Sequence, residues 1–307
     1  MASYLRLEGD HQVSALEDEV GHPGDLWDTL KQKVQNEAIT QFAAVQDDFL
    51  SIIWCLDRYR TEGVTPQGMG RSGANAGRRL EAVYRSKGRW WADLVGLLLE
   101  NRSSSILAPR ARVQGFSQDH RIDVAWPARD GTIEDPRICL VTRMSGAPES
   151  KTTPARAAMD DWPNRRKELK FAATDLKLAQ QPKSAPMGTW EEWRRSRPPK
   201  VFFLWGARLD SKDLPATISR EVQALSATYV DGTGVCAYQT GSSGIGYAAT
   251  PAPAPSGWMT VDEVLDDVGH SMKALSSPVG GASTPATARE ATVDTSGLLS
   301  DQLSDED

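Results

Sequence analysis

The amino-acid sequence predicts an α/β protein in which helices flank a mixed β-sheet. Three short segments rich in β-branched residues follow one another between residues 111 and 144. An apolar run at 200–209 and two more strand-like segments within 234–251 come later, and helical patterns separate these groups. Strands that alternate with helices in this way are typical of α/β domains.

Residues 1–62 are predicted to form an acidic helical region. Apolar residues recur at steps of three and four along residues 25–59, from Leu26 to Leu56. This spacing places them on one face of a single long helix, which we expect to pack on the core or to dock a partner. The stretch 63–77, GVTPQGMGRSGANAG, is rich in glycine and predicts a loop.

Residues 78–275 are predicted to form the α/β domain, and residues 276–307 a disordered acidic tail. Glycine and proline disfavour helix interiors, so we expect Gly88 and Pro163 to kink or interrupt the helices that contain them. In chain order, the expected elements are a helix at 78–101, strands at 111–117, 121–127 and 138–144, a helix at 154–181, a strand at 200–209, a helix at 212–230, strands at 234–241 and 244–251, and a helix at 260–275.

Charge is distributed unevenly along the chain, whose formal net charge is −6. Residues 58–220 contain 30 basic and 18 acidic residues. Residues 1–57 contain 3 basic and 11 acidic residues, and residues 221–307 contain 2 basic and 12 acidic residues. A basic centre between acidic ends indicates a polyanionic partner for the middle of the chain, and we expect that partner to be DNA.

The composition disfavours several other classes of protein. No apolar run is long enough to span a membrane, and the first residues, MASYLRLEGDHQV, lack the apolar core of a secretory signal. The three cysteines are far apart and odd in number, so neither a disulfide framework nor a CxxC metal site is predicted. We therefore expect a cytoplasmic protein without a membrane partner.

The stretch RIDVAWPARDGTIEDPRICLVTRM, residues 121–144, predicts two strands joined by a polar turn. With the helix and strand on either side of it, this stretch resembles the core of the PD-(D/E)xK nuclease superfamily over roughly residues 78–209. The resemblance implies a restriction-endonuclease-like fold, a bacterial or phage setting, and a role for Asp123 as the first metal-binding acid. In that family, this acid and an acid-x-lysine on the next strand hold Mg²⁺, which lowers the pKa of a bound water.

The third strand departs from the family pattern. Val141 stands at the position of the second acid, and Arg143 stands at the position of the lysine. Arginine keeps the positive charge, but a guanidinium stays protonated and is a poor base. Acids on neighbouring segments could replace the missing one: Glu81 or Glu100 on the preceding helix, Glu134 or Asp135 in the turn, and Asp160, Asp161 or Glu168 on the following helix. We take Asp123, Arg143 and Glu100 as the predicted catalytic residues, and Asp123 as the metal ligand.

Two basic clusters predict contacts with DNA. The helix predicted over DDWPNRRKELKFAATDLKL, 160–178, can turn a basic side to phosphate while its apolar side packs on the sheet. The second cluster, TWEEWRRSRPPK at 189–200, combines arginines with two tryptophans one turn apart. The predicted DNA-binding residues are Arg165, Arg166, Lys167, Lys170, Lys177, Arg194 and Arg195.

These observations leave three functions open. A DNA-binding protein without efficient cleavage is favoured, because both expected residues at 141 and 143 are replaced. The first alternative is an active, divergent endonuclease that uses Mg²⁺, Asp123 and a relocated acid. The second is a docking or assembly factor that binds a protein partner, or another copy of itself, through residues 25–59.

Overall fold

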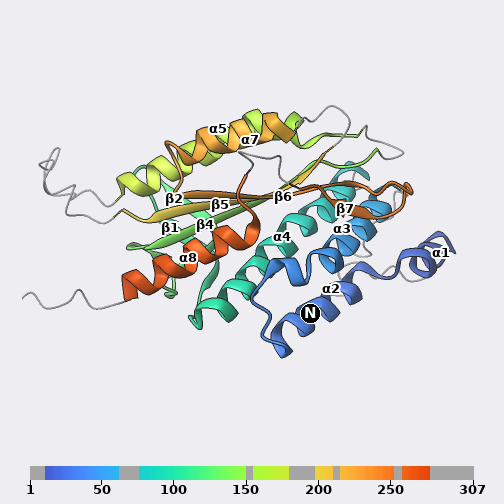
Figure 1. Ribbon diagram of the computed structural model, residues 1–307, viewed down its shortest axis with the longest axis horizontal. Coiled ribbons are helices and arrows are strands. Elements are labelled where there is room, and N and C mark those ends of the chain that lie inside the picture. Colours follow the sequence, from blue (N-terminus) through green and yellow to red (C-terminus); the bar gives the residue numbers. More distant parts are fainter. Residues whose placement is uncertain are drawn as a thin grey trace, which may run out of the picture. The chain divides into compact units, whose positions relative to one another are not determined.

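The computed structural model describes residues 11–61, 76–149, 155–179, 198–209, 215–251 and 258–276. Residues 1–276 form one compact unit, and Figure 1 shows its layers. The predicted tail, most of the predicted glycine-rich loop, and Arg194 and Arg195 lie outside the described residues.

A mixed sheet of seven strands forms the middle layer, as predicted. Its strand order is β3-β1-β2-β4-β5-β6-β7. The strands β4, β5 and β6 are parallel, whereas β1, β2 and β4 pair in an antiparallel manner and β7 is antiparallel to β6. The strands are β1 (Ala108–Gln114), β2 (Asp119–Trp126), β3 (Thr132–Ile133), β4 (Ile138–Ser145), β5 (Lys200–Arg208), β6 (Gly232–Thr240) and β7 (Tyr247–Ala249).

Helices cover both faces of this sheet (Figure 1). One face carries α5 (Ala158–Leu178) and α7 (Pro215–Ser226). The other face carries α4 (Ala76–Ser103) and α8 (Val261–Ser276), with α2 (Pro23–Asn36) and α3 (Gln46–Thr61) packed outside α4. The first helix, α1 (His11–Val20), contacts α3. Within the described residues, no helix is long and apolar enough to cross a membrane.

Each face of the sheet has its own apolar core. Leu140 and Leu204 face the α4 side, where Trp91 is fully buried. Cys139 and Val141 face the α5 side, where Trp162 stacks on Trp205 with ring centroids 4.3 Å apart. The alternation of strand side chains thus places the residues of β4 on two faces, which are both covered by helices.

The prediction of one long helix over residues 25–59 is wrong. The chain forms α2, a 3₁₀ turn at Phe42–Ala44 (η1) and then α3. Ala38 has a positive φ of 48°, and the Asp262 carboxylate accepts hydrogen bonds from the backbone N–H groups of Phe42 and Ala43, at 2.7 and 2.9 Å. A partner on α8, distant in the sequence, therefore stabilises the break between the two helices.

Neither Gly88 nor Pro163 interrupts its helix. Gly88 lies within α4, and Pro163 lies within α5. Pro163 is the sixth residue of α5, so its missing N–H removes one hydrogen bond of the helix. The turn at 128–137 was predicted as a simple connection, but it contains β3, which pairs in parallel with β1.

Candidate functional site

Asp123 lies where β2 and β4 part. The antiparallel pairing of these strands stops at Val124 and Leu140. One residue further along β2, the Asp123 Oδ2 atom accepts a hydrogen bond of 2.7 Å from the backbone N–H of Thr142. A carboxylate thus takes the place of a backbone carbonyl as the acceptor for β4, which satisfies a largely buried donor.

Arginines, not further acids, surround this carboxylate. The Arg143 Nη1 atom lies 3.6 Å from Asp123 Oδ2 and also donates to the Thr142 carbonyl at 3.0 Å. Arg110 stands opposite Asp123 in the register of β1 and β2, at a positive φ of 50°, and donates to Asp93 Oδ1 on α4 at 2.7 Å. Burial raises the pKa of Asp123, although the Thr142 N–H, Arg143 and Arg110 act in the opposite direction.

Five of the seven acids proposed as replacement metal ligands have other partners. Glu100 accepts a hydrogen bond from the Leu107 N–H at 3.4 Å, where it ties the end of α4 to the start of β1. Each of four others bonds to a group near it in the chain: Asp135 to Arg137, Asp160 to the Ala157 N–H, Asp161 to Arg156, and Glu168 to Arg165. In the part of the chain that the structure describes, no three potential metal-ligating side chains cluster. The donors around Asp123 therefore do not fit a carboxylate-bound Mg²⁺.

The pKa of Asp123 gives a testable prediction: Asp123→Asn should be more stable than wild type at pH 8. The pKa of Asp123 in the folded state is raised above the ordinary 3.8. The stability that protonation of Asp123 provides is therefore complete below pH 3.8. It is lost as the pH rises through the folded-state pKa. Thermal unfolding of both proteins from pH 3.5 to 8 should show midpoints that separate as the pH rises. If wild type were more stable than the variant at pH 8, the arginines would lower the pKa of Asp123 by more than burial raises it.

A cavity of about 260 Å³ lies between β2, β4 and α5, and we call it the β2–α5 cavity. Val141, Leu169 and Phe203 give it an apolar floor, and Arg143 is among its polar residues. Phe171 lies at its edge with 51% of its surface exposed. The complete lining is Gln118, His120, Arg121, Ile122, Val141, Arg143, Arg165, Glu168, Leu169, Phe171, Ala172 and Phe203.

A buried polar cluster fixes one wall of the β2–α5 cavity. Asp175 on α5 accepts hydrogen bonds from the Ser117 N–H and hydroxyl, at 2.9 and 2.7 Å, and lies 2.8 Å from His120 Nε2. A side chain on Gly115 would come within 2.1 Å of this carboxylate, so the turn needs glycine there. The cluster ties the β1–β2 turn to α5, which holds Gln118 and His120 beside Phe171.

Three residues of the basic stripe predicted on α5 have partners on neighbouring elements, although their side chains stay partly exposed. Arg166 forms an ion pair with Glu221 of α7, and Lys177 pairs with Asp231 at 2.9 Å. Lys170 lies over the Tyr229 ring, with its Nζ atom 4.5 Å from the centroid. These three residues join α5 to α7 and the turn after it. That these residues contact DNA stays a prediction. Lys167 is exposed and makes no ion pair with the described residues.

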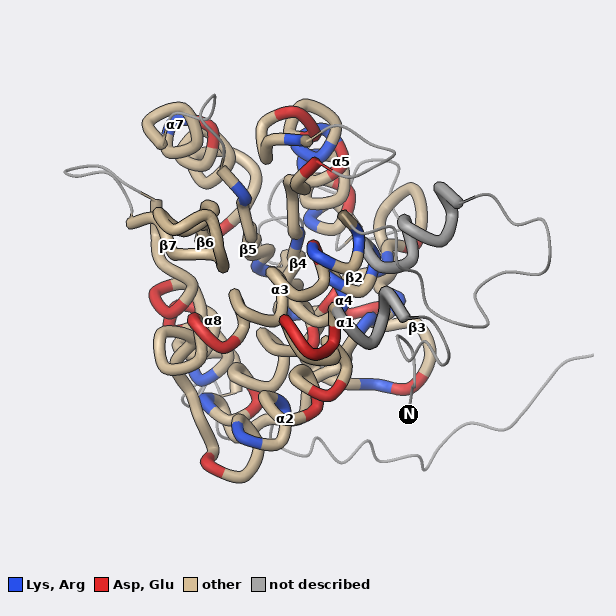
Figure 2. The backbone as a smooth tube through the Cα atoms, turned by 90° about the vertical axis from the view of Figure 1, so that its right-hand side faces the viewer, with Lys and Arg blue, Asp and Glu red and all other residues tan. Residues whose placement is uncertain are grey.

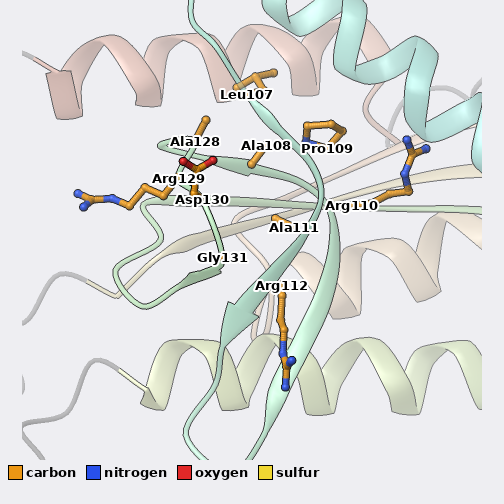
Figure 3. A pocket seen from close by; sticks show the side chains of 10 residues that line it. All are labelled: Leu107, Ala108, Pro109, Arg110, Ala111, Arg112, Ala128, Arg129, Asp130 and Gly131. Carbon is orange, nitrogen blue, oxygen red and sulfur yellow. The ribbon is translucent and has the colours of Figure 1, made fainter.

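A second, more open cavity of about 510 Å³ lies at the edge of β1 (Figure 3). Three arginines line it: Arg110, Arg112 and Arg129. Figure 3 shows that their guanidinium groups point apart, with that of Arg110 directed toward α4. Because the three groups do not converge, this cavity lacks the geometry of an anion site.

A buried polar cluster between α3, α4 and the sheet was not among the predicted sites. Lys87 is 1% exposed, and its Nζ atom lies 2.7 Å from the carboxylate of Asp57, which is 3% exposed. The Tyr247 hydroxyl donates to the same carboxylate at 2.6 Å. Arg208 is also buried, over the Tyr247 ring, and its Nε and Nη1 atoms have no hydrogen-bond partner among the described residues.

Comparisons with family models, curated proteins and solved structures give no match to this chain.

Proposed function

We propose that this protein binds DNA where β2 and β4 part and does not cleave it efficiently. The observation that carries the proposal is that Arg143 and Arg110 lie beside the Asp123 carboxylate. Arg110, Arg143 and Arg121 come from three adjacent strands, and Arg121 makes no ion pair with the described residues. Guanidinium groups suit phosphate recognition, since they remain charged and donate in a fixed fork.

The distribution of charge supports the same proposal. Figure 2 shows Lys and Arg around β2, β4 and α5, with acids interspersed on α5. The central segment from 58 to 220 contains 30 basic and 18 acidic residues. Arg166 and Lys177 pair with acids of the neighbouring elements, whereas Arg121 on β2 makes no ion pair with the described residues. Phosphate contacts of this kind supply most of the affinity in non-specific DNA binding.

The element order supports a distant relation to the PD-(D/E)xK superfamily. The order α4, β1, β2, β4, α5, β5 is that of the predicted core, with the two-residue β3 inserted in the turn. Asp123 occupies the predicted position, and Val141 and Arg143 follow on the adjacent strand. Within this proposal, the fold is retained while the metal site has been replaced by an ion-pair network.

A salt series of DNA binding tests the proposal. Wild type should bind a short duplex with an affinity that falls steeply as the salt concentration rises. Arg143→Gln should weaken binding about three- to tenfold and reduce the salt slope by about one, as expected for one lost phosphate contact. Lys31→Gln, which removes one positive charge from α2 on the other side of the sheet, is the matched control. Absence of salt-sensitive binding by wild type would refute the proposal.

A plasmid assay tests the second part of the proposal, the absence of efficient cleavage. Supercoiled plasmid incubated with Mg²⁺ or Mn²⁺ should remain intact with wild type and with Asp123→Ala. Cleavage by wild type that is lost in Asp123→Ala would overturn the non-cleaving part of the proposal, and DNA binding would remain.

A relocated metal site is the second candidate, and Asp93 favours it. This acid lies on the helix that precedes β1, and Arg110 connects it to the neighbourhood of Asp123. Asp93, rather than Glu100, would then be the second acid. If Arg110 blocks such a site, Arg110→Ala should gain metal-dependent plasmid cleavage; an inactive Arg110→Ala variant would rule this candidate out.

A further inference from the structure

We propose that the β2–α5 cavity holds one unpaired nucleotide of a DNA strand. The base would lie on the apolar floor, and its phosphate would lie among the arginines. This inference rests on the proposed DNA binding and specifies which form of DNA the site prefers.

The size of the cavity limits the occupant. Pockets for small molecules usually measure about 300–1,000 Å³. At about 260 Å³, the β2–α5 cavity is just below that range, which suits a single nucleotide better than a longer stretch of strand. A base inside a duplex cannot enter such a cavity, so the nucleotide must be unpaired or extruded from the stack.

The lining has the two chemical characters that a nucleotide needs. Val141, Leu169 and Phe203 provide an apolar surface for the flat faces of a base. The polar residues include Arg121 and Arg143, which favour an anion over a neutral or cationic ligand. Charge complementarity therefore favours a phosphate-bearing ligand.

Phe171 is the feature that most favours a base. It is one of the large apolar side chains that remain exposed, and it lies on α5 at the edge of the cavity. Its ring lies 5.7 Å from that of His120, in an edge-on arrangement at 61°. An exposed aromatic ring beside a cationic cavity is the arrangement on which unpaired bases stack.

The cavity wall is held in place before any ligand binds. His120 is 8% exposed and lies 2.8 Å from Asp175, which also holds the β1–β2 turn through Ser117. Gln118 on that turn lines the cavity, and its amide can both donate to and accept from a base edge. A preformed wall reduces the ordering cost of binding.

The test compares two DNA duplexes of the same sequence at one salt concentration, one fully paired and one with a single bulged 2-aminopurine. Wild type should bind the bulged DNA about tenfold more tightly, as one stacked base provides, and 2-aminopurine fluorescence should change on binding. Phe171→Ala should lose this preference and keep its affinity for the paired duplex. Phe116→Ala is the matched control, because Phe116 is 63% exposed on the adjacent turn and does not line the cavity.

Each outcome has a distinct meaning. Equal affinity of wild type for the two duplexes would overturn this inference and leave the proposed DNA binding intact. A bulged abasic site that binds as tightly as the bulged base would also overturn it, because the protein would then recognise bent DNA. Failure to bind either duplex would instead refute the proposed function itself.

Discussion

Lys87→Met is expected to lower the free energy of unfolding by about 3–5 kcal/mol, the usual cost of removing one partner of a buried ion pair. Lys87 and Asp57 are almost completely buried, and their charged atoms lie 2.7 Å apart. Without the ammonium group, the Asp57 carboxylate stays buried and keeps the Tyr247 hydroxyl as a neutral donor. Chemical denaturation of the variant and wild type at pH 7 measures the loss.

A double variant separates the effect of the two charges from the effect of lost packing. Asp57→Asn combined with Lys87→Met removes both charges and leaves an oxygen to accept from Tyr247. Replacing both members of a buried ion pair is often nearly neutral, so the double variant should recover most of the loss. A double variant that is as unstable as the sum of the two single variants would show that the ion pair itself contributes little.

The surface pair of Lys33 and Asp48 is the matched control for geometry. Its charged atoms are 2.8 Å apart, almost the same distance as in the buried pair, but its side chains are 40% and 52% exposed. Water solvates both charges when either partner is removed. Lys33→Met should therefore leave the unfolding midpoint unchanged within the error of the measurement.

The sequence was sufficient to predict the elements with a clear periodic pattern. The apolar run at 200–209 became β5, which is covered by helices on both faces, and the helix predicted at 78–101 became α4. The break near Ala38 could not be predicted, because the three- and four-residue spacing continues across it. The bonds from Asp262 that stabilise the break come from a residue more than 200 positions away.

The site was predicted only in part, because several of its contacts join residues that are distant in the sequence. The position of Asp123 between apolar strand residues indicated a special role, and the structure gives it a bond to Thr142. The pairing of Arg166 with Glu221 depends on α7 lying beside α5, which no local pattern shows. Lys87 carried one usable signal, since it lies four residues before Trp91 on the buried face of α4. A lysine in an apolar stripe indicates a buried charge with an acidic partner.

Asp175→Ala is the second substitution with a large expected effect, a loss of about 3 kcal/mol in the free energy of unfolding. Hydrogen bonds to a charged acceptor contribute about 1.5–3 kcal/mol each, and the losses at one carboxylate are not additive. This substitution removes the acceptor for the Ser117 N–H and hydroxyl and the partner of His120. Because Asp175 is 4% exposed, water does not readily replace it.

The pH dependence of this loss identifies the carboxylate as its source. Burial by itself would raise the pKa of Asp175, but the hydrogen bonds from Ser117 and His120 outweigh it and hold the pKa below the ordinary 3.8. The stability that Asp175 provides is therefore complete above pH 3.8 and is lost as the pH falls through the folded-state pKa. The difference in unfolding free energy between wild type and Asp175→Ala should stay constant from pH 8 to about pH 5 and shrink below pH 3.8.

Asp119→Ala supplies the matched control for Asp175→Ala. Asp119 pairs at 2.7 Å with Arg112, whose side chain is 71% exposed, at the other end of the same turn. An exposed pair of this kind contributes less than about 1 kcal/mol. If Asp175→Ala proved no more destabilising than Asp119→Ala, Asp175 would not be what fastens the turn to α5. The same result would remove the preformed wall on which nucleotide binding in the β2–α5 cavity depends.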